Sequence, residues 1–420
     1  MRRRTAVSSL LVAGALALAA CSSSGTGSDG GSSSSSAGQP IKIGGLASLT
    51  GAAASSNVNC ESGIKARLGV ENDKGGINGR KLEYVMADDK SEGPGVVEAI
   101  TKLVEQNHVF GIVTPSAYFA AGADKAAELG VPVSGVSYAS GDFWFEPDKY
   151  PTIFDAYGYG KFRLVATTFG EYFKSVGATK VGAIGYGSSP SSALAAVASV
   201  ESAKAVGLQA GYLDNSLAFG STDVGPIVQK IKESGTDALF VPVVPSTGYA
   251  LVKALRQAGV KLKSVVLATG YGQTVLDDPA TKEASTGVDF FTLTAPIESG
   301  NPRILELQAA LAKYSGAAPK AIPTFDQTVC WLVTDLFVTG LKLPGADASK
   351  EAFAAALRKA TWDGAGITTP TNFADIKPAA GGHDQGNCLY VSRFDGEKFV
   401  VQDDAGPVCG TIAEGVTAKA

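Results

Sequence analysis

Short β-rich runs alternate with amphipathic helical runs from residue 41 onward, and this alternation constrains the fold more than any other feature. The first series predicts strands at residues 41–47, 82–87, 109–113 and 131–134. The second opens with a predicted helix at 160–175 and continues with strands at 180–184, 209–213, 238–241 and 264–267. Such alternation is typical of parallel sheets with helices on both faces. The sequence therefore predicts an α/β fold with two doubly wound parallel-sheet lobes, divided near residues 156–161.

The last part of the chain departs from this rhythm. Helical patterns follow one another with little strand between them, at residues 303–314, 326–341 and 350–360. The runs 389–394 and 398–402 then flank Asp395-Gly396. An Asp-Gly pair between two β-rich runs is a strong hairpin signal. We therefore expect helices followed by a hairpin near the C-terminus.

The N-terminal segment has the pattern of a secretory signal. Three arginines precede an uncharged stretch, residues 5–20, which is rich in Ala, Leu and Val. This stretch is too short to span a bilayer, which takes roughly 20 apolar residues. Leu18-Ala19-Ala20-Cys21 resembles the lipobox of bacterial lipoproteins, and the resemblance implies a signal peptide at 1–20 with Cys21 as the lipidated N-terminus. The alternative is ordinary signal cleavage nearby, with Cys21 incidental.

The segment 21–40 is almost entirely Ser and Gly and carries one charge, at Asp29. A segment of this composition cannot bury a core. We expect a flexible tether that joins the N-terminus to the folded body.

Composition excludes several classes of function. Three of the 36 Lys and Arg residues lie in the leader. The rest of the chain therefore has 33 basic and 40 acidic residues, which gives a formal net charge of about −7. No basic patch stands out, so nucleic acid is not an expected partner. No second hydrophobic stretch is long enough to cross a membrane. The folded part is too long for one typical domain and suits two.

Four cysteines remain besides Cys21: Cys60, Cys330, Cys388 and Cys409. An even count in an exported protein indicates two disulfides, with three possible pairings. No C-x-x-C spacing is present and the two histidines stand far from the cysteines, so we expect no metal site. No G-x-x-x-x-G-K-[ST] motif occurs, and the Gly185-Tyr186-Gly187 turn lacks the third glycine of a dinucleotide motif. No cofactor is expected.

Three segments carry a resemblance to a known family: residues 41–51 (IKIGGLASLTG), 62–93 and 110–140. The most specific part is NDKGGINGRKL, followed by a predicted strand that ends at Asp88-Asp89. These segments resemble the branched-chain amino-acid (Leu/Ile/Val) type of ABC-transporter substrate-binding protein, which has the type I periplasmic binding protein fold. The resemblance covers residues 41–399.

The resemblance implies two lobes joined by a three-strand hinge. Lobe one comprises 41–157 plus 296–360, and lobe two comprises 158–295 plus 361–413. Under this assignment Cys60 pairs with Cys330 in lobe one and Cys388 pairs with Cys409 in lobe two, where the hairpin brings them near each other. A bridge between the lobes would hinder their closure.

The resemblance also implies a function. The chain would be a lipid-anchored, extracytoplasmic, monomeric binding protein that captures a small molecule between its lobes and delivers it to membrane permease subunits. The alternative within the same fold is a ligand sensor that signals to a membrane receptor.

Ligands bind at the carboxyl ends of strands in open parallel sheets, so loops at that edge should line the cleft. Carried over by position, the contacts fall in five loops: Ala54, Ser55 and Ser56; Ser116, Ala117 and Tyr118; Ser137, Tyr138 and Ala139; Pro245, Ser246 and Thr247; Thr269, Gly270 and Tyr271. Ser116 falls where the family binds a carboxylate, although a plain helix N-cap is the alternative. Tyr138 could equally pack between loops.

One departure from the family concerns the ligand. Amino-acid binders place an acidic residue after the strand matching 264–267, where it holds the ammonium group, but here no carboxylate occurs before Asp277. A buried ammonium without a paired charge is costly. Either another acid such as Asp155 substitutes, or the ligand is not an α-amino acid. Because the loops are rich in Tyr, Phe and Trp, we expect an aromatic or otherwise apolar carboxylate.

The alternative from another class of function is an enzyme. Residues 135–139 (GVSYA) nearly match the G-x-S-x-G nucleophile elbow, and His383 lies downstream as in hydrolases. The last glycine is missing and no helical pattern follows Ser137 directly. A serine hydrolase is therefore the remote alternative, and we expect no enzyme activity.

Overall fold

The computed structural model describes residues 38–137, 141–157, 164–376, 388–402 and 407–419. The chain divides into two units, Met1–Gly38 and Gln39–Ala420, and the second holds all the secondary structure discussed below. Within the described residues, no helix is both long and apolar enough to cross a membrane.

The first sheet has five parallel strands. They are β1 (Ile41–Ala47), β2 (Leu82–Asp88), β3 (Gly111–Val113), β4 (Val133–Gly135) and β5 (Ile153–Asp155), in the order β2-β1-β3-β4-β5. Successive side chains of a strand point to opposite faces. Accordingly Ile41 and Ile43 join one core and Leu46 joins the other.

Helices cover both faces of this sheet. One face packs against α1 (Cys60–Asp73), α10 (Pro302–Ser315) and α11 (Phe325–Leu341), and the other against α2 (Gly93–Thr101) and α3 (Ala123–Glu128). Helices α1 and α11 approach closely at Gly63, where an added Cβ would collide with the carbonyl oxygen of Gln327. This close approach requires glycine.

The second sheet has eight strands. Five are parallel neighbours: β7 (Lys180–Tyr186), β8 (Gln209–Leu217), β9 (Ala238–Val241), β10 (Ser264–Leu267) and β11 (Asp289–Thr292). One face packs against α4 (Thr168–Ser175) and α5 (Pro190–Ala205), and the other against α6 (Gly225–Ser234) and α7 (Pro245–Gln257). The predicted α/β fold with two doubly wound lobes is confirmed.

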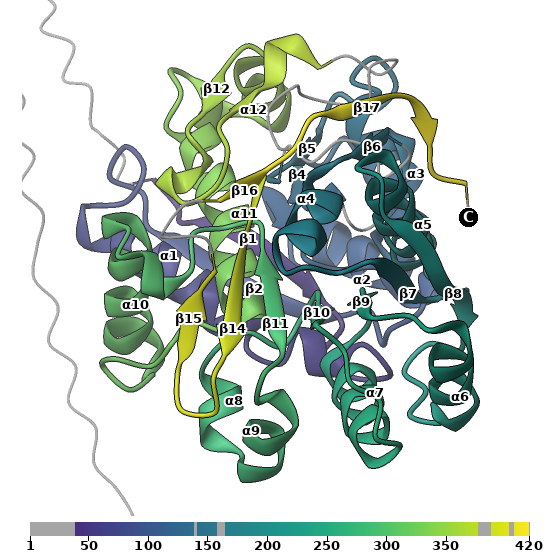
Figure 1. The fold of residues 1–420 in the computed structure, drawn as a ribbon. Helices are drawn as coiled ribbons and strands as arrows, with labels where there is room; N and C mark the ends of the chain where they lie inside the picture. Colours follow the sequence, from purple (N-terminus) through teal and green to yellow (C-terminus); the bar gives the residue numbers. More distant parts are fainter. Residues whose placement is uncertain (1–37, 138–140, 158–163, 377–387, 403–406, 420) are drawn as a thin grey trace, which may run out of the picture. The chain divides into compact units, whose positions relative to one another are not determined.

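The C-terminal hairpin extends this second sheet. Strand β14 (Cys388–Phe394) pairs antiparallel with β11, and β15 (Phe399–Val401) pairs antiparallel with β14; Figure 1 shows the two as a yellow hairpin beside β11. β16 (Val408–Cys409) pairs with β14. Both predicted disulfides are confirmed, because Cys60 bonds Cys330 and Cys388 bonds Cys409.

The remaining elements are short. They are α8 (Gln273–Asp277), α9 (Pro279–Ser285), α12 (Lys350–Leu357), β6 (Leu164–Ala166), β12 (Thr361–Trp362), β13 (Thr371–Asn372) and β17 (Ile412–Thr417). The helix predicted at 160–175 is wrong at its start, because β6 precedes α4 and pairs with β17 (Figure 1). The partner strand lies some 250 residues further along the chain, so local pattern could not reveal it.

The segment 361–376 packs differently from its predicted assignment to lobe two. Trp362 and Phe373 are buried in the core of the first sheet, together with Phe154 and Phe353. The segment also contacts the chain where it leaves the second sheet after β11, since the amide of Ala295 donates to the carbonyl of Ile367 at 2.7 Å. In this structure the chain therefore stays with lobe one until at least residue 376.

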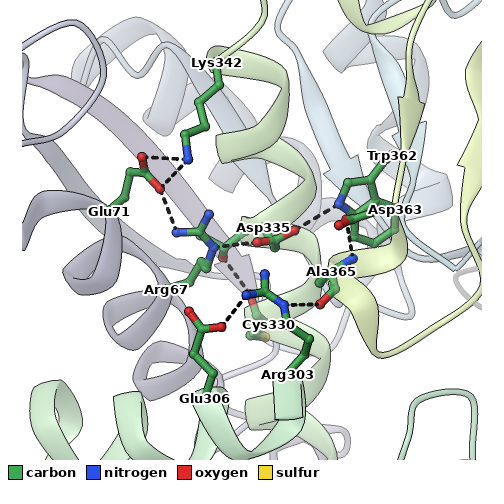
Figure 2. A network of polar contacts seen from close by, with 11 residues as sticks. Arg67, Glu71, Arg303, Glu306, Cys330, Asp335, Lys342, Trp362, Asp363 and Ala365 are labelled. Atoms are coloured by element: carbon green, nitrogen blue, oxygen red, sulfur yellow. Dashed lines mark hydrogen bonds and ion pairs between the residues drawn. The ribbon is translucent and has the colours of Figure 1, made fainter. Parts of the chain in front are cut away.

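A buried polar network joins these distant parts of lobe one (Figure 2). Nε of Arg67 on α1 donates to Asp335 Oδ1 on α11 at 2.6 Å, and Nε1 of Trp362 donates to Asp335 Oδ2 at 3.0 Å. Glu71 pairs with both Arg67 and Lys342, at 3.2 and 2.9 Å. The side chains of Arg67, Asp335 and Glu71 are at most 7% exposed. One carboxylate thus ties α1, α11 and β12 together.

Replacing Asp335 by Ala should lower the free energy of unfolding by about 3–5 kcal/mol, because the buried Arg67 guanidinium loses one of its two carboxylate partners and the indole N–H of Trp362 loses its acceptor. Chemical denaturation measures this loss. The control is Glu306→Ala, which removes an exposed ion pair with Arg303 on α10 and should cost about 0–1 kcal/mol. Equal effects of the two changes would contradict the role given to Asp335.

Candidate functional site

A cavity of about 140 Å³ lies where loops at the carboxyl ends of strands from both sheets meet. The first lobe contributes the loop after β1 and the loop after β3. The second lobe contributes the segments that follow β7, β9 and β10. The sequence predicts ligand contacts in loops at the carboxyl ends of the strands, and the cavity lies at the same edge of both sheets.

The walls of the cavity are mainly apolar. They include Tyr157, Tyr186, Phe219, Phe240, Val243, Val244, Phe291, Leu293 and Phe325. The ring of Phe219 lies 4.4 Å from that of Tyr186 and 5.7 Å from that of Tyr118, centroid to centroid. Because Tyr118 belongs to lobe one and Phe219 to lobe two, an aromatic contact joins the lobes beside the cavity.

Polar groups in the lining come from two places. The first lobe supplies Ser56 and Asn57, and the second supplies Ser189, Ser191, Ser192 and Thr269. The Ser56 hydroxyl and the Asn57 carboxamide oxygen are buried and make no hydrogen bond with the described part of the chain. The described residues that line the cavity include no charged side chain. An apolar chamber with a few hydroxyl and amide groups is the arrangement expected for small-molecule binding.

Hydrogen bonds hold the lobe-one loop in place. Asp88 at the end of β2 accepts from the amides of Leu49 and Thr50, at 2.9 and 3.2 Å, and from the Thr50 hydroxyl at 2.6 Å. Burial opposes ionisation of Asp88, but the bonds from Thr50, Lys90 and Leu49 together outweigh it and lower its pKa. A charged acceptor therefore fixes the chain just before the cavity-lining residues.

The same loop is anchored again at its far end. The amide of Asn59 donates to Asp326 Oδ2 on α11 at 2.6 Å, and Cys60 next to it forms the disulfide with Cys330. Burial raises the pKa of Asp326, although its hydrogen bonds to Thr324 and Asn59 oppose the shift. The loop that presents Ser56 and Asn57 is thus tied at both ends.

Some predicted contact residues line the cavity and others do not. Ser56, Ala117 and Thr269 line it. The Thr269 hydroxyl donates to the carbonyl of Val243 at 2.7 Å. Ser246 is exposed in the first turn of α7. Tyr138 and Ala139 lie outside the described residues.

Ser116 and Tyr118 have other partners in this structure. The hydroxyl of Ser116, which is fully buried, donates to the carboxylate of Asp89 and accepts from the Tyr118 amide at 3.1 Å. Ser116 nevertheless stands between Pro115 and Ala117, which both line the cavity. The predicted contact of Ser116 with the carboxylate of a ligand stays a prediction.

Tyr271 lies at the junction of the lobes rather than in the cavity. Its hydroxyl donates to Glu298 at 2.6 Å and accepts from the amide of Ile297 at 3.1 Å. Burial, followed by the neighbouring Glu298, raises the pKa of Tyr271. Tyr271 therefore braces the crossing between the lobes.

Asp155 and Ser137 contact each other. Asp155 is 4% exposed, and its Oδ1 accepts from the amides of Ser137 and Tyr157 at 2.8 and 3.1 Å. Asp155 is not among the residues that line the cavity. It orders the loop after β4 and does not supply an acid to the chamber.

Sequence reasoning missed most of the second-lobe wall. Tyr186 ends β7, and Ser189, Ser191 and Ser192 follow it. Their place at the carboxyl end of a strand is a signal that could have found them. Phe219 comes after β8 at the edge of the sheet, and no pattern in the sequence marks it.

No group of three or more His, Cys, Asp or Glu side chains in the described ranges could hold a metal ion. His383 lies outside those ranges, so the pairing of Ser137 with His383 has no structural test.

The chain is similar to a known protein family in sequence and to solved structures in fold. A sequence model of a family described as periplasmic binding protein matches residues 40–398. No curated protein matches the chain in sequence. The solved structures that are similar include substrate-binding proteins of ABC transporters, and all those compared below are under 25% identical, so their likeness concerns the fold.

Three of these structures illustrate the range. A fatty acid ABC transporter substrate-binding protein from Thermomonospora curvata has a TM-score of 0.70 and 18% identity, covering 91% of this chain and 95% of that chain. A solute-binding protein from R. palustris in complex with benzoate has a TM-score of 0.68 and 18% identity, covering 90% and 98%. The branched-chain amino acid binding protein LivJ from Streptococcus pneumoniae, in complex with isoleucine, has a TM-score of 0.65 and 20% identity, covering 86% and 100%.

Replacing Ser116 by Ala should lower the free energy of unfolding by about 1.5–3 kcal/mol, because the buried Asp89 carboxylate loses a donor. Thermal or chemical denaturation measures the change. The matched control is Ser55→Ala, an exposed serine of the first cavity loop, which should stay within about 0.5 kcal/mol of the wild type. Unchanged stability of the Ser116 variant would show that its bond to Asp89 contributes little.

Proposed function

Because the chain belongs to the periplasmic binding protein family, we propose that it is the lipid-anchored substrate-binding protein of an ABC importer, and that it carries a small apolar carboxylate. The observation that supports the proposal most is the chamber between the lobes, whose walls are aromatic and aliphatic and whose described lining contains no charged side chain. The three similar structures described above are named as substrate-binding or solute-binding proteins of transporters.

The chemistry of the chamber favours an apolar acid over an α-amino acid. An ammonium group taken out of water needs a carboxylate partner, and the described lining offers none. A carboxylate can instead be received by backbone N–H groups at a helix N-terminus. Helix α5 begins at Pro190, beside the lining residues Ser189 and Ser191. The fatty acid and benzoate named for two similar structures are ligands of this chemical kind.

Ligand capture would work through both lobes. A ligand that touches walls from both lobes favours the arrangement in which they are close together, because only that arrangement makes all its contacts. The Tyr118–Phe219 contact belongs to this arrangement. We infer that the closed protein is the form that delivers its ligand to the membrane permease.

The proposed location follows from the N-terminal segment. Lipidation at Cys21 would hold the protein on the outer face of the membrane, and the Ser- and Gly-rich segment after it would leave the folded body free to reach a permease. Attachment by more than one acyl chain is needed for a stable anchor.

Calorimetric titration of the protein lacking its leader should show binding of benzoate or a medium-chain fatty acid, and no binding of leucine or isoleucine. Apolar acids fill the chamber, whereas the amino acids must bury an unpaired ammonium group. Phe219→Ala should weaken binding of the acid by about ten-fold, since it removes an aromatic wall. The exposed Val400 provides the control, as Val400→Ala should not change the affinity. Binding of leucine without any response to the acids would refute the proposed ligand class.

Replacing Cys21 by Ser should move the protein from the membrane fraction to the soluble fraction, because the serine cannot be acylated. Fractionation and the intact mass of the purified protein check this. Cys409→Ser is the matched control: it removes a cysteine of the folded body and should leave the protein on the membrane. A Cys21 variant that stays membrane-bound with an unmodified mass would rule out the anchor.

A further inference from the structure

Asn57 is a buried acceptor that lines the chamber. Its side chain is 4% exposed, and its Nδ2 donates to the carbonyl oxygen of Ala53 at 3.2 Å. This bond turns the amide nitrogen toward the backbone. The carboxamide oxygen then receives no hydrogen bond from the described part of the chain. A buried acceptor in this situation is costly, so a ligand that brings a donor to it gains affinity.

Ser56 precedes Asn57 in the sequence and adds a hydrogen-bond donor to the acceptor that Asn57 provides. Its hydroxyl oxygen is also buried, lines the same chamber and has no hydrogen bond within the described residues. A serine hydroxyl can donate, whereas an amide oxygen only accepts. A ligand hydroxyl could donate to Asn57 and accept from Ser56 at once. The pair therefore fits a hydroxyl group better than it fits a carboxylate, which cannot donate to Asn57.

The opposite wall offers a site for an anion. Helix α5 has 16 residues, begins with Pro190, and receives no capping hydrogen bond from the Ser189 side chain. The first-turn amides of Ser191 and Ser192 have no acceptor within their own helix. Ser189 and Ser191 are 9% and 8% exposed, and their hydroxyl oxygens lie 3.2 Å apart. The positive end of a long helix thus opens on the chamber.

We propose that the ligand is a hydroxylated apolar carboxylate, held with its carboxylate at the start of α5 and its hydroxyl at Asn57 and Ser56. This inference rests on the proposed function and narrows its ligand class. The two polar sites belong to opposite lobes, so such a ligand spans the chamber and bonds to both walls. Asn57 is then the residue that selects hydroxylated acids over plain ones.

The test compares benzoate with 3-hydroxybenzoate and 4-hydroxybenzoate by calorimetry, in the wild type and in Asn57→Leu. The wild type should bind at least one hydroxylated acid about three- to ten-fold tighter than benzoate. In Asn57→Leu this ratio should fall to about one, and a far-UV circular dichroism spectrum like that of the wild type, with cooperative thermal unfolding, shows that the variant is folded. Asn57→Ala should give the same result and replaces the leucine variant if that variant is unstable.

Two controls separate the parts of the proposal. Asn215→Leu, on β8 and outside the cavity lining, should keep the wild-type preference. Replacing benzoate by benzamide removes the negative charge and should weaken binding if α5 receives the anion. Equal affinities for plain and hydroxylated acids, or a preference that survives Asn57→Leu, overturns this inference and leaves the proposed function standing. If none of these acids binds while another class of ligand does, both fall.

Discussion

The junction between α1 and α11 is the constraint on which the rest of lobe one depends. The two helices lie on either side of lobe two in the sequence, and a disulfide and a buried ion pair, Cys60–Cys330 and Arg67–Asp335, join them. The cavity loop ends where α1 begins, and its last amide bonds to Asp326 at the start of α11. The positions of Ser56 and Asn57 therefore depend on the contact between α1 and α11.

The second lobe stiffens its side of the chamber by other means. The hydroxyl of Tyr186 donates to Thr247 at 2.6 Å and accepts from the amide of Val244 at 3.3 Å. The hydroxyl of Ser192 accepts from the Tyr186 amide at 2.9 Å and donates to the carbonyl of Pro242. These bonds join the segments after β7 and β9 without using the ligand. A wall whose polar groups are already ordered loses less entropy when a ligand binds.

Much of the fold could be predicted from the sequence because its signals are local. The strands at 41–47, 238–241 and 264–267 agree with β1, β9 and β10, and the hairpin around Asp395-Gly396 forms as expected. The errors occur where distant residues decide. β6 exists because β17 pairs with it, and Trp362 stays with lobe one because Asp335 accepts its N–H.

The candidate site was predictable in outline and not in its chemistry. The carboxyl-edge rule selects the loops that contain Ser56, Ala117 and Thr269, since strand direction alone determines which edge they share. Whether a side chain faces the chamber depends on its partners. Ser116 is turned toward Asp89 and Tyr271 toward Glu298, and neither partner is visible from sequence spacing. Phe219 follows the edge strand β8 and reaches the cavity by packing against Tyr186. The periodicity of the sequence does not indicate this contact.

The order of the chain through the two lobes has a kinetic consequence. Cys60 and Cys330 are separated by 270 residues, and β14 joins β11 only after most of the chain is present. Contacts this distant are slow to form because chain closure must precede them. Each lobe needs segments that come late in the chain, α11 and β12 for the first and β14 for the second, so a factor that delays folding until the C-terminal hairpin has emerged protects both.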